Sequence, residues 1–194
     1  RIAGTIHHAV DTATHTFRAT ADDYLLFLGR FTKGKGVPQA IEVARRTGHR
    51  LLLAAAENDY YREHVAPLVD GSRVQYVGEV TGDAKVALLG GARALLYPVQ
   101  LPEPFGLVLT EAMACGTPAA ALNLGAVAEV VDHGVSGGVF DTLDALFAGL
   151  PQVLALDRAV VRATAERRFS LERMIDAYVD VYRRLVDGPE TPPR

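Results

Sequence analysis

The chain has 194 residues, of which 49% are hydrophobic and 22% charged, a balance typical of folded globular proteins rather than of disordered or membrane-spanning ones. Its formal net charge of −3 argues against nucleic-acid binding, which requires a basic surface. The single cysteine excludes a disulfide within the chain, and no apolar run approaches the roughly 20 residues that cross a bilayer.

Short apolar runs recur along the chain, each bounded by glycine or polar residues, and such runs are typical of strands buried on both faces. They lie at residues 24–28, 51–55, 74–77, 94–97, 118–122 and 138–140. Helical spacing of apolar residues predicts helices between them, from residue 37 to an end at Gly48 and then at residues 60–69, 83–89, 106–114 and 126–131. This alternation predicts an α/β fold with a Rossmann-like, doubly wound parallel sheet and C-terminal helices.

Polar segments follow three of the predicted strands directly. They are Gly29-Arg30, Gly78-Glu79 and residues 103–106. Ligands of doubly wound sheets bind beyond the carboxyl ends of the strands. We therefore expect these segments to converge on one edge of the sheet, although they lie far apart in the sequence.

The segment LPEPFGLVLTEAMACGTP, residues 101–118, carries the strongest chemical signal. It places two carboxylates, Glu103 and Glu111, around a Pro-Phe-Gly turn that opens onto a helix-forming run. Glycine at a helix start lets a ligand approach the free backbone amides, which form an anion site. Two turns of helix bring Glu111 back towards the face of the first turn. This arrangement suits a phosphorylated, polyhydroxylated ligand and indicates, in outline, a nucleotide-sugar site.

These segments resemble, in the same order along the chain, motifs of retaining glycosyltransferases of family 4, which have the GT-B fold. The resemblance lies in the Glu-x7-Glu spacing of Glu103 and Glu111, in the Gly-Arg turn and Lys-Gly of residues 24–41, and in residues 74–80 and 92–98. It implies the donor-binding C-terminal half of a GT-B enzyme. Such an enzyme transfers a hexosyl group from a nucleoside diphosphate sugar to a hydroxyl and keeps the anomeric configuration.

The resemblance also implies how the chain is divided. The chain begins without Met, and residues 6–11, IHHAVD, are similar to the segment just after the interdomain linker of the family. We expect a linker-like entry at residues 1–22, a nucleotide-sugar-binding Rossmann-like domain at 23–187 and a disordered tail at 188–194. The N-terminal acceptor-binding domain is expected to be missing, so this chain alone should bind the donor but transfer poorly.

By resemblance, each site residue has an expected role. Arg30 and Lys35 would contact the donor diphosphate, and Lys33 is an alternative to Lys35. Glu103 would hydrogen-bond the transferred sugar and help to stabilise its oxocarbenium-like state, and Glu111 would hold the ribose hydroxyls. The expected catalytic residues are Arg30, Lys35 and Glu103. The expected substrate-binding residues are Gly29, Val80, Phe105, Gly106, Leu107, Val108 and Glu111.

No metal or cofactor is expected besides the donor substrate. No Asp-x-Asp motif follows a predicted strand, and the histidines lack metal-ligand spacing. Cys115 is predicted to be a small core residue. We expect the cytoplasm as the compartment, with peripheral membrane attachment of the full-length enzyme left open. Two other functions stay open: half of a GT-B phosphorylase or epimerase, and a non-catalytic nucleotide-sugar-binding module that acts with a partner chain.

A last helix is predicted after Ser170, whose hydroxyl can accept a hydrogen bond from a first-turn amide. Its apolar side chains form one stripe: Leu171, Met174, Ile175, Tyr178, Tyr182 and Leu185. Two partners are open for this stripe. It could pack against the local core, or the helix could cross back to the other domain, as the last helix does in two-domain relatives.

Overall fold

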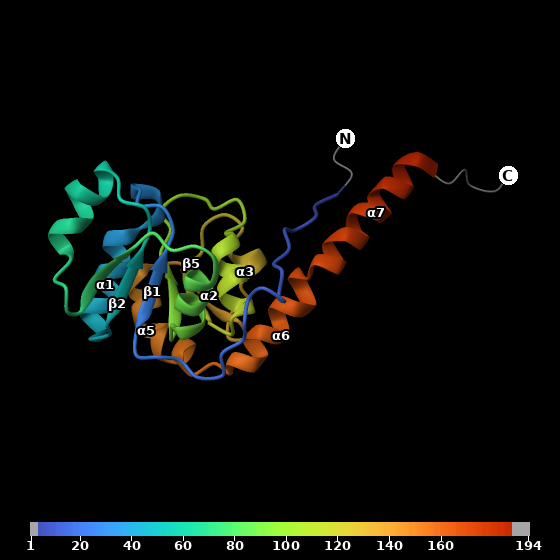
Figure 1. Ribbon diagram of the computed structural model, residues 1–194. Coiled ribbons are helices and arrows are strands. Elements are labelled where there is room, and N and C mark those ends of the chain that lie inside the picture. Colours follow the sequence, from blue (N-terminus) through green and yellow to red (C-terminus); the bar gives the residue numbers. More distant parts are fainter. Residues whose placement is uncertain (1–3, 188–194) are drawn as a thin grey trace.

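The computed structural model describes residues 4–187, which form a six-stranded parallel sheet with helices on both faces (Figure 1). The expected tail at residues 188–194 lies outside the described residues. The strands lie in the order β3-β2-β1-β4-β5-β6. In chain order they are β1 (Leu25–Leu28), β2 (Leu51–Ala54), β3 (Val74–Gly78), β4 (Ala94–Tyr97), β5 (Ala119–Leu122) and β6 (Gly137–Phe140). This topology confirms the predicted doubly wound α/β fold.

Helices connect the strands and extend the C-terminal part. They are α1 (Val37–Thr47), α2 (Gly82–Gly91), α3 (Leu107–Ala114), α4 (Val127–Val130), α5 (Leu143–Leu154), α6 (Arg158–Phe169) and α7 (Leu171–Asp187). Short helical segments are η1 (Lys33–Lys35), η2 (Tyr61–Val65) and η3 (Ala66–Leu68). The helices predicted from apolar spacing are therefore present, except at residues 60–69.

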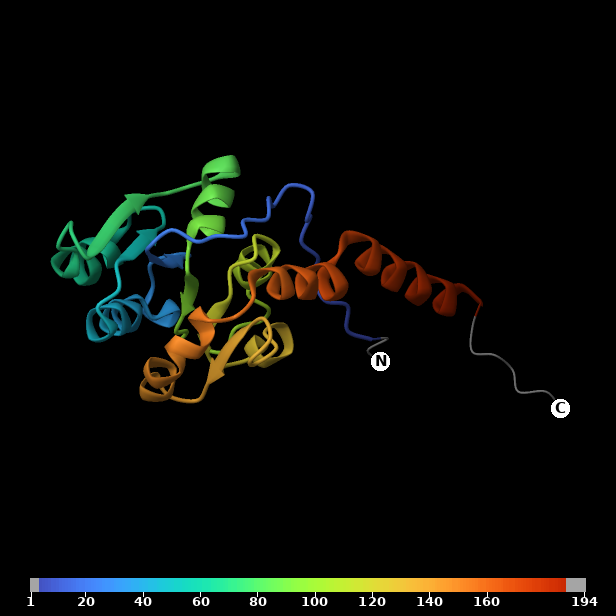
Figure 2. The same ribbon diagram turned by 90° about the horizontal axis from the view of Figure 1, so that it is seen from below.

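The central strand β1 shows why a continuous apolar run forms the middle of this sheet. Leu25 and Phe27 pack into the core cluster that includes side chains of α1 and α5. Leu26 faces the other way, into the cluster with side chains of α2, α3 and α6. Figure 2 shows these helices on the two sides of the sheet. Because both faces are covered, side chains of both orientations are buried, each burial being worth roughly 1.5–3 kcal/mol.

Residues 60–69 differ from the single helix that the sequence predicts. The segment divides into the π-helical η2 and the 3-10 turn η3. Pro67, the second residue of η3, explains the division. Proline lacks a backbone N–H, and its ring clashes with the carbonyl one turn earlier, so an α-helix cannot continue through it.

The entry segment, residues 4–23, has no regular helix or strand and is held against the domain by α6. Arg162 of α6 donates a 2.9 Å hydrogen bond to the carbonyl of Thr12. One turn earlier, Arg158 donates a 2.8 Å hydrogen bond to the carbonyl of Arg18. These guanidinium groups satisfy backbone carbonyls that would otherwise lack partners, and they fix the path of the entry segment towards the cleft described below.

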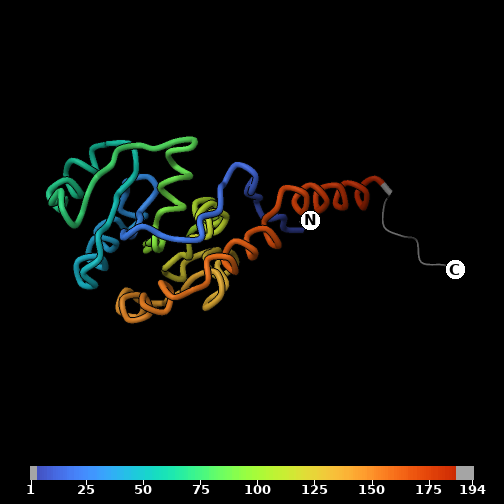
Figure 3. The backbone as a smooth tube through the Cα atoms, turned by 60° about the horizontal axis from the view of Figure 1, so that its bottom comes forward, coloured from blue at the N-terminus to red at the C-terminus, as the bar shows by residue number. Residues whose placement is uncertain are grey.

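Helix α7 continues beyond α6 and projects away from the sheet (Figures 1 and 3). The amide of Arg173 donates to Oγ of Ser170 at 3.3 Å, which confirms the predicted cap. The apolar stripe is solvent-exposed along the helix, including Leu171, Ile175, Tyr178, Tyr182 and Leu185. Packing of the stripe against the local core is therefore wrong, and contact with another domain stays a prediction. Within residues 4–187, no helix is both long and apolar enough to cross a membrane.

Candidate functional site

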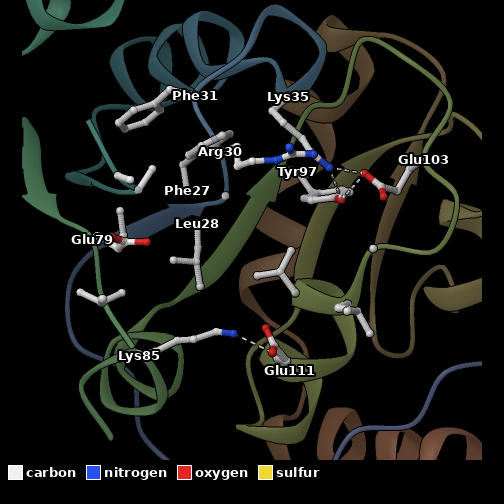
Figure 4. Close-up of a pocket in the computed structure, with 18 of the residues that line it drawn as sticks. Phe27, Leu28, Arg30, Phe31, Lys35, Glu79, Lys85, Tyr97, Glu103 and Glu111 are labelled. Atoms are coloured by element: carbon white, nitrogen blue, oxygen red, sulfur yellow. Dashed lines mark hydrogen bonds and ion pairs between the residues drawn. The ribbon is translucent and has the colours of Figure 1, made fainter. Parts of the chain in front are cut away.

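A cleft of about 660 Å³ opens beyond the carboxyl ends of the strands (Figure 4). Its volume lies within the roughly 300–1,000 Å³ of ordinary ligand pockets. The chain leaves β1 towards one side and β4 towards the other, so a crevice forms between their ends. All ten predicted site residues line it: Gly29, Arg30, Lys35, Val80, Glu103, Phe105, Gly106, Leu107, Val108 and Glu111. Their positions thus come together as expected, whereas their chemical roles stay predictions.

Arg30 follows the end of β1 directly and extends its side chain into the cleft (Figure 4). The residue is exposed, and its guanidinium forms no ion pair or side-chain hydrogen bond with any other described residue. A guanidinium offers a planar fork of donors that matches phosphate oxygens. Arg30 is therefore an available anion-binding group at the mouth of the cleft.

Of the two candidate lysines, the structure places Lys35 in the cleft, whereas Lys33 is exposed and does not line it. Gly36 explains how the chain can turn there. It has φ of 72°, and a Cβ at this position would lie 1.8 Å from the carbonyl oxygen of Pro98. Only glycine allows this close approach between the turn after β1 and the segment after β4, and the approach brings Lys35 beside the opposite wall.

Lys35 contacts a carboxylate on that wall. Its Nζ lies 2.5 Å from Oε2 of Glu103, and the hydroxyl of Tyr97 donates to the same oxygen at 2.6 Å. Burial alone would raise the pKa of Glu103, but the hydrogen bonds from Lys35 and Tyr97 outweigh it and hold that pKa below its ordinary value. Burial, with the hydrogen bond to Glu103, raises the pKa of Tyr97 far above its usual range. At neutral pH, therefore, Glu103 is an ionised carboxylate with two fixed donors.

The backbone of Glu103 is held as firmly as its side chain. Two backbone hydrogen bonds join it to the loop after β5. The amide of Glu103 donates to the carbonyl of Leu124, and the amide of Ala126 donates to the carbonyl of Glu103 at 2.8 Å. A Cβ at Gly125 would lie 2.4 Å from the backbone of Glu103. This loop therefore holds the backbone of Glu103 in place, a role that the sequence analysis did not assign to it.

Helix α3 begins against the cleft. Gly106 is its N-cap with φ of 84°, and the amides of Leu107 and Val108 belong to the first turn, where helix N–H groups have no partner within the helix. A Cβ at Gly106 would lie 2.9 Å from Cδ1 of Leu109 and 3.2 Å from the hydroxyl of Tyr97. The helix N-terminus carries the equivalent of about +0.5 charge, so this edge of the cleft favours an anion.

The ring of Phe105 anchors the turn before α3. It is buried and packs edge-on against Phe169 of α6, with 5.9 Å between ring centroids. His8 of the entry segment, which also lines the cleft, packs edge-on with the same ring, with 5.2 Å between ring centroids. The entry segment thus contributes one exposed side chain, His8, to the lining of the cleft.

Glu111 lies one turn into α3, not two turns as expected, because the helix begins only at Leu107. It also has a basic partner, which sequence reasoning missed. Nζ of Lys85, from α2, lies 2.6 Å from Oε1 of Glu111. Lys85 lines the cleft, and Figure 4 shows this pair at the opposite end from Lys35 and Glu103. A single lysine in a predicted helix carries no recognisable spacing, so only the packing of α2 beside α3 reveals it.

Among residues 4–187, no three His, Cys, Asp or Glu side chains come together as a possible metal site. Metal-independent chemistry stays a prediction. The cleft instead holds three cations, Arg30, Lys35 and Lys85, which can meet the charge of a bound anion. Cys115 is buried, and burial raises the pKa of its thiol to about 11, so it is an unreactive core residue.

With this geometry established, comparison with known proteins decides the family. The family described as "Glycosyl transferases group 1" matches residues 14–167, which is most of the chain. The chain belongs to this family. It is 33% identical over 119 residues to an uncharacterised glycosyltransferase of Methanocaldococcus jannaschii, a match that covers 58% of this chain and 30% of that protein.

A second relative is the glycogen synthase of Mycobacterium tuberculosis, which is 34% identical over 143 residues. That match covers 68% of this chain and 34% of the synthase. The chain thus spans about a third of the length of these curated relatives. The activity, substrates and partners of the whole protein therefore belong to the proposal below.

Solved structures support the fold. A glycosyltransferase involved in avilamycin A biosynthesis superposes with a TM-score of 0.82 at 31% identity, covering 95% of this chain and 58% of that chain. An Anabaena protein solved in complex with UDP and glucose has a TM-score of 0.76 at 19% identity, with coverage of 91% and 56%. Identity that low shows likeness of fold alone. The predicted Rossmann-like sheet of GT-B glycosyltransferases is confirmed.

Proposed function

We propose that the cleft binds a nucleoside diphosphate sugar and that the chain is the donor-binding half of a retaining, metal-independent glycosyltransferase. One observation carries the proposal. The cleft joins an arginine that has no side-chain partner among residues 4–187, the start of α3 and two carboxylates at opposite ends. A nucleotide sugar has the complementary order of groups: ribose hydroxyls, a diphosphate and sugar hydroxyls.

The diphosphate is assigned to the middle of the cleft. Arg30 supplies a forked donor and the first-turn amides of α3 supply a second set of donors to phosphate oxygens. Lys35 lines the same cleft, and its ammonium has three N–H donors, so it can donate to a phosphate oxygen while it keeps its contact with Glu103. These cations stabilise the charge that the leaving diphosphate gains as the glycosidic bond breaks.

Glu103 is assigned to the transferred sugar. Its carboxylate is fixed by Lys35 and Tyr97 and remains ionised, so it accepts hydrogen bonds from sugar hydroxyls and favours a developing positive charge on the ring. A carboxylate so constrained is a poor nucleophile. We therefore assign retention to attack on the same face that the diphosphate leaves, with the leaving phosphate receiving the proton of the acceptor hydroxyl.

The acceptor is assigned to a separate N-terminal domain. The chain spans about a third of its curated relatives, and the cleft lies open at the edge of the sheet. On this proposal the chain alone binds the donor and transfers poorly. The proposed compartment is the cytoplasm, in keeping with a single, unpaired cysteine; peripheral attachment of the full-length enzyme to a membrane is the alternative.

Two other functions use the same cleft. A phosphorylase or epimerase half would bind the same donor type, and a non-catalytic module would bind it for a partner chain. The names of the two relatives above, a glycosyltransferase and a glycogen synthase, favour sugar transfer over both.

Isothermal titration of the 194-residue chain with UDP-, GDP- and ADP-sugars, with and without EDTA, tests the proposal. We expect saturable binding of one donor class and the same affinity with the chelator. Absence of binding to every nucleotide sugar would overturn the proposed function. A strict requirement for Mg²⁺ or Mn²⁺ would overturn the metal-independent mechanism while leaving donor binding in place.

A further inference from the structure

The ion pair between Lys85 and Glu111 joins two helices across one end of the cleft. The two atoms, Nζ and Oε1, are 2.6 Å apart, and the side chains are only 29% and 20% exposed. Both side chains line the cleft (Figure 4). The pair is thus largely shielded from solvent and faces the ligand cleft, where it can act on a bound ligand as well as on the contact between α2 and α3.

The pair occupies only one of the two carboxylate oxygens of Glu111. Lys85 takes Oε1 of Glu111, while Oε2 forms no hydrogen bond with any residue in the described range. A glutamate side chain loses considerable rotamer freedom when it is fixed in one position. If Lys85 fixes it beforehand, a ligand that binds to Oε2 does not bear that loss. The geometry is thus that of a carboxylate oriented for a second donor.

The charges of the cleft give Lys85 a second possible effect. Three cations, Arg30, Lys35 and Lys85, face three carboxylates, Glu79, Glu103 and Glu111. Without Lys85 the balance shifts by one negative charge, next to the place where an anionic ligand must bind. Lys85 therefore has two possible effects on a nucleotide: a local one through the orientation of Glu111, and a longer-range one through charge.

We infer that Lys85 is a positioning residue that holds Glu111 so that its second oxygen accepts hydrogen bonds from the 2′ and 3′ hydroxyls of the donor ribose. This inference rests on the proposed function, because it takes Glu111 as the residue that binds the ribose. It gives α2 a role in donor recognition through Lys85, a residue that lies outside the Glu-x7-Glu motif. The local effect, rather than the longer-range charge, is the main one.

The test compares two ligands that differ only at the ribose. The probes are UDP, GDP or ADP, whichever binds the wild-type chain, and its 2′,3′-dideoxy analogue. Lys85→Met should weaken binding of the ribonucleotide about tenfold or more and change binding of the dideoxy analogue by less than about twofold. Lys85→Arg should retain most of the affinity, because it can still donate to Glu111.

A matched control removes an ion pair elsewhere. Arg46 of α1 lies 2.8 Å from Asp144 of α5, so this pair also joins two helices, but neither residue lines the cleft. Arg46→Met should leave the affinity for both ligands unchanged. A Lys85→Met, Glu111→Ala double variant should bind the ribonucleotide no more weakly than Glu111→Ala alone, since the two residues act through one contact.

Three results would overturn the inference and leave the proposed function in place. Equal weakening for both ligands in Lys85→Met would show that Lys85 acts on the phosphates or on the placement of α2. Unchanged ribonucleotide binding would show that the pair is only a contact between helices. Equal binding of both ligands by the wild-type chain would show that the ribose hydroxyls make no contact with Glu111. Failure of the wild-type chain to bind any of the three nucleotides would overturn the proposed function as well.

Discussion

The hydroxyl of Tyr97 donates a 2.6 Å hydrogen bond to Oε2 of Glu103, six residues further along the chain. Tyr97 ends β4 and is buried, so its ring is fixed by the core while its hydroxyl reaches the cleft. The rigid sheet thereby determines where the carboxylate lies. Lys35 reaches the same oxygen from the other side of the crevice, and the three residues form one connected group.

Tyr97→Phe should keep the fold and loosen Glu103. Losing a hydrogen bond to a charged acceptor should lower the free energy of unfolding by about 1.5–3 kcal/mol. The affinity for a nucleotide sugar should fall, while the affinity for the corresponding nucleoside diphosphate should stay the same, because only the sugar contacts Glu103. Urea unfolding and titration with both ligands measure these effects.

Tyr24→Phe is the control for this change. The hydroxyl of Tyr24 donates to the carbonyl of Leu88 at 2.8 Å, and Tyr24 does not line the cleft. It should lose stability with no change in sugar recognition. If Tyr24→Phe and Tyr97→Phe alter ligand affinity alike, the hydrogen bond to Glu103 has no special part in recognition.

Arg30→Ala should weaken binding of a nucleoside diphosphate far more than Lys33→Ala. Arg30 lines the cleft and has no side-chain partner in the part of the chain that the structure describes, whereas Lys33, three residues on, lies outside the cleft. Loss of charge-assisted hydrogen bonds corresponds to roughly 1.5–3 kcal/mol, or about 10- to 150-fold in affinity. Titration of both variants with the same ligand decides the matter. Wild-type affinity in Arg30→Ala would mean that this arginine is only solvated.

The strands, and the edge of the sheet where the polar segments meet, could be predicted because both depend on local patterns. Leu25 to Leu28 are apolar at every position, which in a soluble chain requires cover on both faces. Polar residues directly after such runs then lie at one edge by topology alone. For the same reason the positions of Arg30 and Glu103 could be predicted without knowledge of their contacts.

The partners of the carboxylates could not be predicted, because they depend on how distant elements pack. Lys85 meets Glu111 only because α2 lies beside α3, and Tyr97 meets Glu103 only through the turn between them. At residues 60–69 the apolar spacing alone predicted one helix, but Pro67 divides the segment into η2 and η3. In α7, the same spacing gave no indication of whether Ile175 faces this domain or solvent.

Gly36→Ala should destabilise the fold and also disturb Lys35. The new Cβ would meet the carbonyl of Pro98 at 1.8 Å, and φ of 72° is unfavourable for alanine. Overpacking and backbone strain together should cost roughly 2–5 kcal/mol. Gly48→Ala is the matched control, since Gly48 has φ of 75° but open space around it, and only strain of about 1–2 kcal/mol is expected there.

Urea unfolding measures both glycine variants, and titration with a nucleotide sugar measures the cleft. Gly48→Ala should bind the ligand like the wild type, because the end of α1 lies away from the cleft. Gly36→Ala should bind more weakly under conditions in which it remains folded. Equal losses of stability in the two variants would contradict the close approach of Gly36 to Pro98.

Glu103 and Glu111 should separate in their effects, because they lie at opposite ends of the cleft and each has its own lysine (Figure 4). Glu111→Ala should weaken binding of the nucleoside diphosphate and the nucleotide sugar alike, since its proposed partner is the ribose that both ligands carry. Glu103→Ala should spare the nucleoside diphosphate and weaken recognition or transfer of the sugar. Each effect should be about tenfold or more, as for a hydrogen bond to a charged group.

Titration of both variants with the two ligands gives four affinities, and the pattern matters more than any single value. Each alanine variant also leaves a lysine without an acceptor. Glu103→Gln and Glu111→Gln should therefore accompany the alanine variants, because their amide oxygens can still accept from the lysine. If both carboxylate variants lose nucleoside diphosphate affinity equally, or neither loses any, the division of roles is wrong. The motif would then support the turn before α3 rather than read the two ends of the donor.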